Sequence, residues 1–271
     1  MNKSDIWANA EAYEQYVGRW SRLVAREFVG WLTVPPGSHW LDVGCGTGAL
    51  TEVILQHAQP AEVTGVDPSE GFVAYAREHV QDGRVSFKVG DAMVLPFGDE
   101  MFGAVVAGLV LNHIPTPGVA LAEMVRVARR GGIVGAYVWD YAGQMQMMRV
   151  FWDAAVELDP AIVELDQGRR YPICQPEPLG ELFKSAGLTG VEVQAIDVAT
   201  HFRDFDDYWL PFLGGQGPAP SYATALTEEK KLALRERIRS KLPIAQDGSI
   251  SLIARAWAVH GSKSQRSAST A

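Results

Sequence analysis

The residues of this chain that are best suited to chemistry form one short glycine-rich turn. Gly44, Gly46 and Gly48 are spaced two apart and follow the apolar stretch 40–43, and a helical pattern begins at about residue 49. Glycine adopts backbone angles that a Cβ forbids, and it lets a ligand lie against bare backbone. A strand, a glycine turn and a helix N-terminus together form a cradle for a nucleotide-type ligand.

The spacing around this turn leaves more than one nucleotide open. Gly44-x-Gly46-x-x-Ala49 fits the permissive dinucleotide pattern. Asp67 lies 19 residues after Gly48, at the end of the expected second strand, where an acidic residue binds ribose hydroxyls. A P-loop is excluded because no Lys-Ser or Lys-Thr pair follows the last glycine. A tight turn with a purely structural role is the remaining alternative.

Asp42, near the end of the first expected strand, favours a ligand that carries positive charge. A dinucleotide places its pyrophosphate at this point, and like charges cost free energy in a partly dry site. The same carboxylate would attract a sulfonium with an α-ammonium group. Its alternative role is to accept hydrogen bonds from the amides of the glycine turn, and the two roles are compatible.

Alternating strand and helix patterns must position these residues. Five runs rich in Val, Ile, Leu, Ala and Gly are expected to be strands, at 39–43, 62–67, 85–89, 104–109 and 133–139. Helical patterns are found at 13–31, 49–57, 69–80 and 118–129. Near-continuous apolar strands are typical of a parallel sheet that is covered on both faces. The alternation predicts an α/β fold with a doubly wound, mostly parallel, Rossmann-like sheet of seven strands.

The pattern changes after residue 139 and predicts helical insertions around the last two strands. Helices are expected at 144–165, 179–186 and 228–241, and strands at 191–198 and 251–259, the last one antiparallel. The insertions are rich in aromatic residues and would either form a cap over an apolar substrate or build only their own core; these residues are Tyr171, Phe202, Phe205, Tyr208, Trp209, Phe212 and Tyr222. The predicted organisation is a helical lid at 1–36, a cofactor-binding core at 37–140, the rest of the core with helical cap insertions at 141–260, and a disordered tail at 261–271.

Composition excludes several classes of protein. The chain has 271 residues, a net charge of −8 and 47% hydrophobic residues, which is ordinary for a globular protein. The acidity predicts that nucleic acid is not a partner. The two cysteines, Cys45 and Cys174, give neither a disulfide framework nor a metal-binding spacing. Because neither a signal-peptide core nor an apolar run of membrane-spanning length is seen, we expect a cytoplasmic protein without a metal ion or membrane span, as a monomer or homodimer.

Three sequence motifs occur in the order found in one enzyme family. They are Asp42-Val43-Gly44-Cys45-Gly46-Thr47-Gly48, Gly65-Val66-Asp67-Pro68-Ser69, and Gly90-Asp91-Ala92 followed by Leu95-Pro96-Phe97. Together they resemble the motifs of the class I S-adenosylmethionine-dependent methyltransferases, with the closest likeness to the ubiquinone/menaquinone-biosynthesis type and its small-molecule relatives. The likeness covers about half of the chain, and Arg129-Arg130-Gly131-Gly132 stands where the family usually has Lys-Pro-Gly-Gly.

The resemblance implies that S-adenosylmethionine is the cofactor and assigns residues to it. The three glycines would lie under its methionine part and ribose, and Asp67 would accept hydrogen bonds from the ribose hydroxyls. Asp91 would accept one from the adenine amino group, and the amide of Ala92 would bond the ring. The alternative for Asp91 is a cap or turn residue after the third strand. The other cofactor-binding residues implied in the core are Asp42, Pro68 and Leu109.

Further candidates lie at the end of the fourth strand and in the N-terminal helix. In the family the segment 109–113 lies near the transferred methyl group, so His113 would take a proton from the acceptor as the catalytic candidate. The alternative is a histidine that hydrogen-bonds backbone or cofactor. N-terminal helices of the family fold over the cofactor, so Arg19 would pair with its carboxylate and Tyr16 would pack beside it. The alternative there is an amphipathic helix with a surface Arg and buried aromatic residues.

The chain is thus predicted to transfer a methyl group from S-adenosylmethionine to a small, apolar or aromatic molecule by in-line displacement. Such a reaction depends mainly on alignment and exclusion of water. No Gly-x-Ser-x-Gly, His-Glu-x-x-His or cysteine cluster supports a hydrolase or metalloenzyme. Two alternatives remain, a non-catalytic S-adenosylmethionine-binding protein and an NAD(P)-dependent oxidoreductase, which would usually need a Tyr-x-x-x-Lys pair that the sequence lacks.

Overall fold

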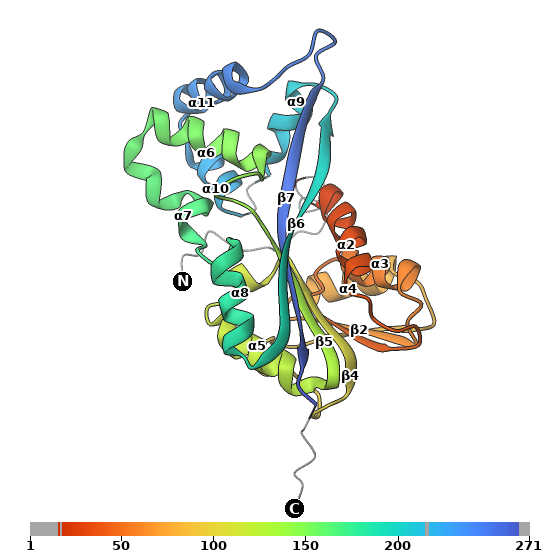
Figure 1. Cartoon of the computed structure of the whole chain (residues 1–271). Coiled ribbons are helices and arrows are strands. Elements are labelled where there is room, and N and C mark those ends of the chain that lie inside the picture. The colour runs from red at the N-terminus through yellow and green to blue at the C-terminus, as the bar shows by residue number, and fades with distance from the viewer. Residues whose placement is uncertain (1–15, 17, 215–216, 266–271) are drawn as a thin grey trace, which may run out of the picture. The chain divides into compact units, whose positions relative to one another are not determined.

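A computed structural model describes residues 16, 18–214 and 217–265 of the chain. Within these residues seven strands form one sheet in the order β3-β2-β1-β4-β5-β7-β6 (Figure 1). The strands β1 to β5 are parallel, whereas the last two strands are antiparallel. This confirms the predicted α/β class, the mostly parallel sheet and its antiparallel edge. The strand bounds are β1 His39–Val43, β2 Glu62–Asp67, β3 Val85–Val89, β4 Phe102–Gly108, β5 Ala128–Trp139, β6 Leu188–Phe202 and β7 Ile250–Lys263.

The chain divides into two compact units. The sheet unit comprises Ser21–Val138, Gln175–Ile196 and Trp257–Ala271, and the helical unit comprises Met1–Trp20, Trp139–Cys174 and Asp197–Ala256. The strands β6 and β7 therefore contribute residues to both units. The predicted boundaries at residues 36, 140 and 260 are a different division of the same chain, and they stay predictions.

The sheet unit has an apolar core on both faces of the central strands. In β1 only His39 is exposed, and Phe102–Ala107 of β4 are all buried. Figure 1 shows α3 (Ala49–His57) and α4 (Glu70–His79) on one side of the sheet and α5 (Pro117–Val127) and α8 (Pro176–Ser185) on the other. Because helices cover both faces, the central strands need no polar alternation, which is the pattern that the sequence displays.

Several elements begin or end at other residues than predicted. The strand β5 starts at Ala128 instead of residue 133, because Gly131, with φ +71°, allows an irregularity in its pairing with β4 without ending the strand. The strand β6 runs past the predicted residue 198 because burial still alternates through Thr200 and Phe202. The strand β7 extends at its C-terminal end to Lys263. Gly261–Lys263 therefore belong to a strand, although the sequence analysis assigned them to the tail.

The predicted helix at 144–165 is two elements. The helix α6 (Gln146–Leu158) ends before Pro160, which lacks the amide hydrogen that a continuing helix needs. A 3₁₀ helix, η3 (Pro160–Leu165), follows, and the carboxylate of Asp159 accepts a bond from Ala161 N at its start. The predicted helix at 13–31 is observed as α2 (Arg19–Trp31), and Tyr13 lies outside the described residues.

The helical unit is built around aromatic residues. The rings of Phe151 and Phe212 stack with centroids 4.5 Å apart, and the ring edge of Tyr16 meets Phe212 at 5.5 Å. Arg149 makes a two-pronged ion pair with the buried Asp166, at 2.9 and 2.8 Å. Besides α6 and η3, the helices that lie wholly within this unit are α7 Gln167–Arg170, α9 Phe205–Trp209, η4 Leu210–Leu213, α10 Pro218–Ala225 and α11 Glu228–Lys241.

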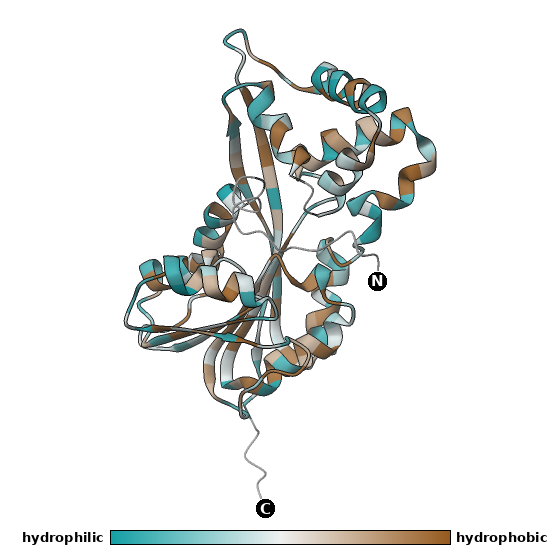
Figure 2. Cartoon of the chain, turned by 180° about the vertical axis from the view of Figure 1, so that it is seen from behind, coloured by the Kyte–Doolittle hydropathy of each residue, from teal (hydrophilic) through white to brown (hydrophobic). Residues whose placement is uncertain are grey.

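The aromatic residues of the predicted cap mostly serve this core. Phe202, Phe205, Tyr208, Trp209 and Phe212 are all buried, whereas Tyr171 and Tyr222 are partly exposed. The helix α11 contributes little apolar surface and is hydrophilic along most of its length (Figure 2). The structure therefore gives these five rings a packing role, and their role as a substrate cap stays a prediction. None of the helices in the described ranges is long and apolar enough to cross a membrane.

Candidate functional site

The site begins at a buried carboxylate in β1. The side chain of Asp42 is 1% exposed, and its Oδ2 accepts a hydrogen bond of 2.7 Å from the hydroxyl of Thr51 in the first turn of α3. Burial raises the pKa of Asp42 to about 7, the bond from Thr51 opposes this shift, and the negative charge of Asp67 adds to it. The strand and the helix are thus joined beneath the turn by a carboxyl group that changes charge near neutral pH.

The glycine turn that follows β1 is left-handed at all three predicted positions. The φ angles of Gly44, Gly46 and Gly48 are +73°, +53° and +91°, a region that residues with a Cβ rarely adopt. The amides of Gly44 and Cys45 both donate to the carbonyl oxygen of Val66 in β2, at 2.7 and 3.1 Å. These bonds fix the turn to the neighbouring strand.

The three glycines have different surroundings. A Cβ on Gly44 would lie 2.5 Å from Val110 Cγ2, and one on Gly48 would lie 2.9 Å from Val80 Cγ2. An ideal Cβ on Gly46, in contrast, would have no atom of the described residues within 4 Å apart from its chain neighbours. Gly44 and Gly48 therefore allow close packing within the chain, whereas Gly46 leaves bare backbone beside open space.

Asp67 ends β2 and ties the turn to the next helix. Its Oδ2 accepts a bond of 3.0 Å from Gly46 N, and its Oδ1 accepts one of 2.8 Å from Ser69 N. The residue is 7% exposed, and burial raises its pKa although both amide bonds oppose the shift. A carboxylate has about four lone-pair sites, so each oxygen retains the capacity to accept one more bond.

Asp91 follows β3 at the same edge of the sheet. The strands β3, β2 and β1 are parallel neighbours, so their carboxyl ends bring Asp91, Asp67 and Asp42 to one edge. The amide of Gly90 donates to the carbonyl oxygen of Asp67 at 3.1 Å. The side chain of Asp91 is exposed, and its Oδ1 accepts a bond of 2.8 Å from Met93 N. Asp91 thus has the turn role that the sequence left open, and this role does not exclude a bond to a ligand.

The fourth strand ends earlier than the sequence predicted. The strand β4 ends at Gly108, Leu109 has φ +59°, and a 3₁₀ turn, η2 (Leu111–His113), follows. A left-handed Leu is strained, and it is held here by a bond of 2.8 Å from its amide to the carbonyl oxygen of Tyr137. This kink directs Val110 toward Gly44. The end of β4 is therefore packed against the glycine turn.

His113 lies in the 3₁₀ turn, next to a buried amide. Its Nε2 is 3.1 Å from Asn112 Nδ2, and Asn112 is 9% exposed, whereas His113 itself is partly exposed. Of the remaining core candidates, Pro68 is exposed after β2, and Ala92 is partly exposed after Asp91. All these residues belong to the sheet unit.

The two N-terminal candidates belong to the helical unit and have partners there. The hydroxyl of Tyr16 donates to Met148 Sδ at 3.0 Å, and burial raises the pKa of this phenol. Arg19 donates to the carboxylate and the carbonyl oxygen of Asp207, at 3.1 and 3.3 Å, and its guanidinium lies over the ring of Trp20. These donors of Arg19 therefore serve the carboxylate and the carbonyl oxygen of one residue of the chain itself. The predicted cofactor role of both residues stays a prediction.

Sequence reasoning missed Thr51 and Val110. The Thr51 hydroxyl is fully buried and holds Asp42, although nine residues separate the two. A polar residue at a helix position facing the sheet was the one signal available for Thr51. Val110 leaves no room for a Cβ at position 44, and nothing about a valine at position 110 indicates this contact.

The arrangement suits a ligand with hydroxyl groups, an amino group and positive charge. Three carboxylates lie at one sheet edge beside a stretch of bare backbone. The carboxylates accept hydrogen bonds, and the amides of the turn donate them. The described residues contain no group of three or more His, Cys, Asp or Glu side chains placed to hold a metal ion. Both cysteines are buried and free.

Comparisons with known proteins agree with this chemistry. A family described as "Methyltransferase domain" matches residues 41–136. The demethylmenaquinone methyltransferase of Symbiobacterium thermophilum is 31% identical over 224 residues, which cover 72% of this chain and 86% of the relative. The 2-methyl-6-phytyl-1,4-hydroquinone methyltransferase of Synechocystis is 31% identical over 188 residues, covering 68% of this chain and 58% of the relative.

The fold also has relatives among solved structures. Phosphoethanolamine N-methyltransferase 2 of Haemonchus contortus, solved in complex with S-adenosyl-L-methionine, superposes with a TM-score of 0.58 at 19% identity. The match covers 94% of this chain and 57% of that one. At this identity the likeness extends to the fold alone.

Proposed function

The chain belongs to the class I S-adenosylmethionine-dependent methyltransferases of the quinone-biosynthesis type, and from this premise we propose that its methyl acceptor is a small aromatic molecule of the hydroquinone class. The observation that carries the proposal is the extent of the likeness to the Symbiobacterium relative. That likeness spans 224 residues, whereas the match to the methyltransferase-domain family ends at residue 136. Two relatives at this identity are named for a demethylated menaquinone and a hydroquinone.

The residues at the sheet edge fit S-adenosylmethionine. Bare backbone at Gly46 would let the methionine part and ribose lie on the turn, with Gly44 and Gly48 shaping it. The spare lone pairs of Asp67 would accept the ribose hydroxyls. Asp42 would supply negative charge toward the ammonium and sulfonium groups of the cofactor.

The segment after β3 would bind the base. Asp91 uses Oδ1 in its own turn, so Oδ2 would accept the adenine amino group, and the amide of Ala92 would donate to the ring. Pro68, exposed after Asp67, and the left-handed Leu109 would line the cofactor on either side. A purely structural role for Asp91 is the alternative that the variants described below test.

The chain's own residues have few chemical tasks in this reaction. When bound, the cofactor supplies an electrophilic methyl group on a cationic sulfur. Since charge disperses during the displacement, alignment of the acceptor and exclusion of water carry most of the catalysis. His113 would accept a proton where the acceptor must lose one. The net charge of −8 supports a small molecule over nucleic acid as the acceptor.

Binding and transfer assays test this proposal together. Calorimetry should detect binding of S-adenosylmethionine and S-adenosylhomocysteine and none of NADH. A labelled-methyl assay over hydroquinones, monophenols, amines and carboxylic acids should place label on the hydroquinones. Label on amines alone would refute the acceptor class, and binding without transfer to any acceptor would support a non-catalytic role.

We expect Asp67→Ala to weaken binding of S-adenosylhomocysteine about 30-fold. Loss of hydrogen bonds to an ionised acceptor costs about 2 kcal/mol, which corresponds to this ratio. Calorimetry with S-adenosylhomocysteine and with its 2′,3′-dideoxyribose analogue separates the ribose contacts from the turn that Asp67 also holds. The variant and the wild type should bind the analogue with similar affinity. An equal loss for both ligands would remove Asp67 from the ribose role.

A further inference from the structure

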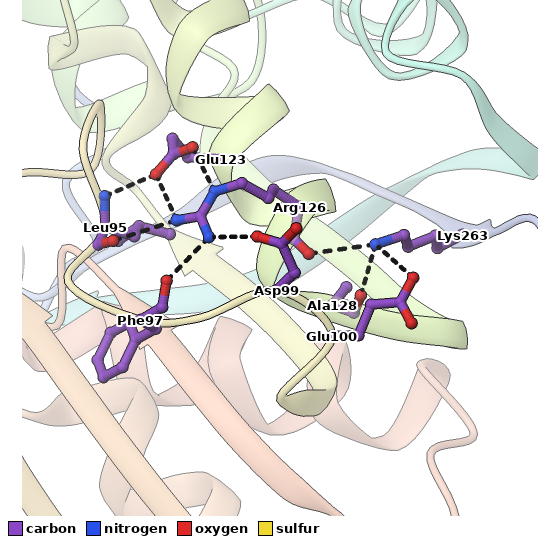
Figure 3. Close-up of polar contacts among 8 residues, drawn as sticks. All are labelled: Leu95, Phe97, Asp99, Glu100, Glu123, Arg126, Ala128 and Lys263. Carbon is purple, nitrogen blue, oxygen red and sulfur yellow. Dashed lines mark hydrogen bonds and ion pairs between the residues drawn. The ribbon is translucent and has the colours of Figure 1, made fainter.

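An arginine at the end of α5 is hydrogen-bonded to the loop 95–99, which follows the expected adenine-binding residues Asp91 and Ala92. Arg126, in the last turn of α5, donates to the carbonyl oxygens of Leu95 at 3.1 Å and Phe97 at 2.8 Å (Figure 3). It also donates to the carboxylates of Glu123 and Asp99. The five residues belong to the sheet unit. Arg126 thus connects a helix to three points of one loop.

The geometry uses the whole guanidinium. Nε donates to Glu123 Oε1 at 2.7 Å, Nη2 to Glu123 Oε2 at 2.7 Å and to Leu95 O, and Nη1 to Asp99 Oδ1 at 2.8 Å and to Phe97 O. Arginine has five N–H groups, and five acceptors receive them. The hydrogen bonds from Arg126 also lower the pKa of Glu123. A lysine has three donors around a single nitrogen and could not replace this fork.

Glu123 completes the attachment of the loop. Its Oε2 accepts a bond of 2.9 Å from Leu95 N, so both backbone polar groups of Leu95 end on the Arg126–Glu123 pair. Leu95 is buried, with 3% of its surface exposed. The carbonyl oxygen of Leu95 also accepts a bond of 2.8 Å from Phe97 N within the loop, whereas the amide of Leu95 is bonded to Glu123 of the helix. A buried backbone group without a partner is costly, and this pair therefore fixes the Leu95 segment of the loop to α5.

The same helix end is held from its other side. Lys263, at the end of β7, donates to the backbone carbonyl oxygens of Arg126 at 3.1 Å and Ala128 at 2.9 Å, and it lies 3.7 Å from the carboxylate of Glu100 (Figure 3). A cation at the C-terminus of a helix satisfies carbonyl groups that have no partner within the helix. The amide of Glu100, directly after the loop, also donates to the carbonyl oxygen of Arg126 at 3.1 Å. The backbone from which Arg126 extends is therefore held by two residues outside the segment 95–99.

The held loop determines the position of Asp91. The amide of Val94 donates to Asp91 O at 3.1 Å, and the two residues form a β-bridge. The ring of Pro96 packs on Gly90, so closely that a Cβ at position 90 would lie 3.2 Å from Pro96 Cδ. Residues on both sides of Leu95 thus contact Gly90 and Asp91. Displacement of Leu95 would displace the carboxylate that is expected to face the adenine.

We propose that Arg126 and Glu123 are positioning residues for adenine recognition, which they support by fixing the loop 95–99 against Gly90 and Asp91. The inference rests on the proposed assignment of Asp91 to the adenine amino group. Neither side chain of the pair touches the cofactor in this proposal. Their effect should therefore appear as a change in base discrimination that depends on Asp91.

The test compares S-adenosylhomocysteine with S-inosylhomocysteine, whose base carries an oxo group in place of the amino group. Calorimetry should find that the wild type prefers the adenosyl compound at least tenfold, because a site that accepts from an amino group leaves the oxo group opposed to a carboxylate. Asp91→Asn should reverse or abolish this preference. Arg126→Gln should weaken binding of S-adenosylhomocysteine about tenfold and bring the preference close to one.

A double-variant cycle decides whether Arg126 acts through Asp91. In the Asp91→Asn background, Arg126→Gln should change the affinity for S-adenosylhomocysteine by less than twofold. If Arg126 acts through Asp91, the effects of the two substitutions are coupled and do not add. Arg84→Gln is the matched control. Arg84 also forms a two-pronged pair, with Asp82, and it also donates to a backbone carbonyl oxygen, that of Leu55. It differs from Arg126 in that it lies before β3 and does not contact the loop 95–99. This control should keep the wild-type preference. Protection of the Leu95 amide from hydrogen exchange should fall in Arg126→Gln and not in Arg84→Gln.

The outcomes separate this inference from the assignment on which it rests. If Asp91→Asn keeps the wild-type preference, the adenine role of Asp91 is refuted. If Asp91→Asn changes the preference but Arg126→Gln weakens both ligands equally and additively, the positioning role is refuted. Should Arg126→Gln fail to fold, Arg126→Lys retains the charge without the fork, and the same comparison applies to it with the same two decisions.

Discussion

We expect Gly46→Ala to weaken binding of S-adenosylhomocysteine about 100-fold while lowering the free energy of unfolding by only about 1 kcal/mol. The φ of +53° costs an alanine about 1 kcal/mol. Its Cβ would meet no atom of the described residues beyond its chain neighbours, so packing within the chain adds little to this cost. In the complex the methyl group would occupy space that the ligand fills, and such overlap costs about 3 kcal/mol. Calorimetry and urea unfolding measure the two effects separately.

Two other glycines provide the controls for this prediction. Gly37 also has positive φ, +74°, and open space at its Cβ among the described residues, so Gly37→Ala should reproduce the unfolding cost without the loss of binding. Gly44→Ala should instead destabilise the protein by about 2 to 5 kcal/mol, because its Cβ collides with Val110. Val110→Ala in the same chain should relieve part of that loss.

The result can contradict the proposed cofactor position directly. If Gly46→Ala binds S-adenosylhomocysteine as tightly as Gly37→Ala does, no ligand lies against the backbone at position 46. If Gly46→Ala loses as much stability as Gly44→Ala, the open space seen at Gly46 is closed in solution. Either outcome would mean that the bare backbone at Gly46 does not contribute to the site.

The comparison of these glycines explains what the sequence can and cannot predict. The motif spacing predicted the turn and its left-handed backbone, because that conformation follows from local geometry. The sequence could not distinguish Gly44, where a Cβ would collide with Val110, from Gly46, where a Cβ would meet open space among the described residues. That difference depends on Val110, which the segment after β4 brings against the turn, and no local pattern encodes it.

The same limit applies to the elements and to the charged residues. The bounds of α3, β1 and β2 were predicted to the residue, because continuous apolar runs and helical spacing are local signals. Ion pairs and hydrogen bonds between residues far apart in the sequence have no such local signal. The role of Arg19 at a ligand carboxylate stays a prediction, but its pairing with Asp207, 188 residues away, had no signal in the sequence. Sequence reasoning assigned no role to Arg126, because its partners, at Leu95, Phe97 and Asp99, lie up to 31 residues before it.

We expect Asp42→Asn to remove a pH-dependent loss of stability and the proton release that accompanies binding of S-adenosylmethionine. In the folded chain the pKa of Asp42 is raised by burial to about 7, from an ordinary value of 3.8. A raised pKa means that the stabilising protonated form is present at low pH and is lost as the pH rises toward 7. Between pH 5 and pH 8 the wild type should lose about 3 kcal/mol of unfolding free energy through this group, and the asparagine variant should not. Urea unfolding at the two pH values measures the difference.

Cofactor binding should reverse the balance at the same carboxyl group. A cationic ligand favours the ionised form of Asp42, so wild-type affinity for S-adenosylmethionine should rise between pH 5 and pH 8, with release of up to one proton. Calorimetry in buffers of different ionisation enthalpy counts that proton. Asp82→Asn is the control, because Asp82 belongs to an exposed pair with Arg84 and should leave the proton count unchanged. If wild type and Asp42→Asn release the same number of protons, Asp42 serves only to hold Thr51 and the turn. If the variant releases none, the carboxylate that the sequence placed beneath the glycines discriminates by charge, and this accounts for a cationic ligand at a turn that otherwise suits a dinucleotide.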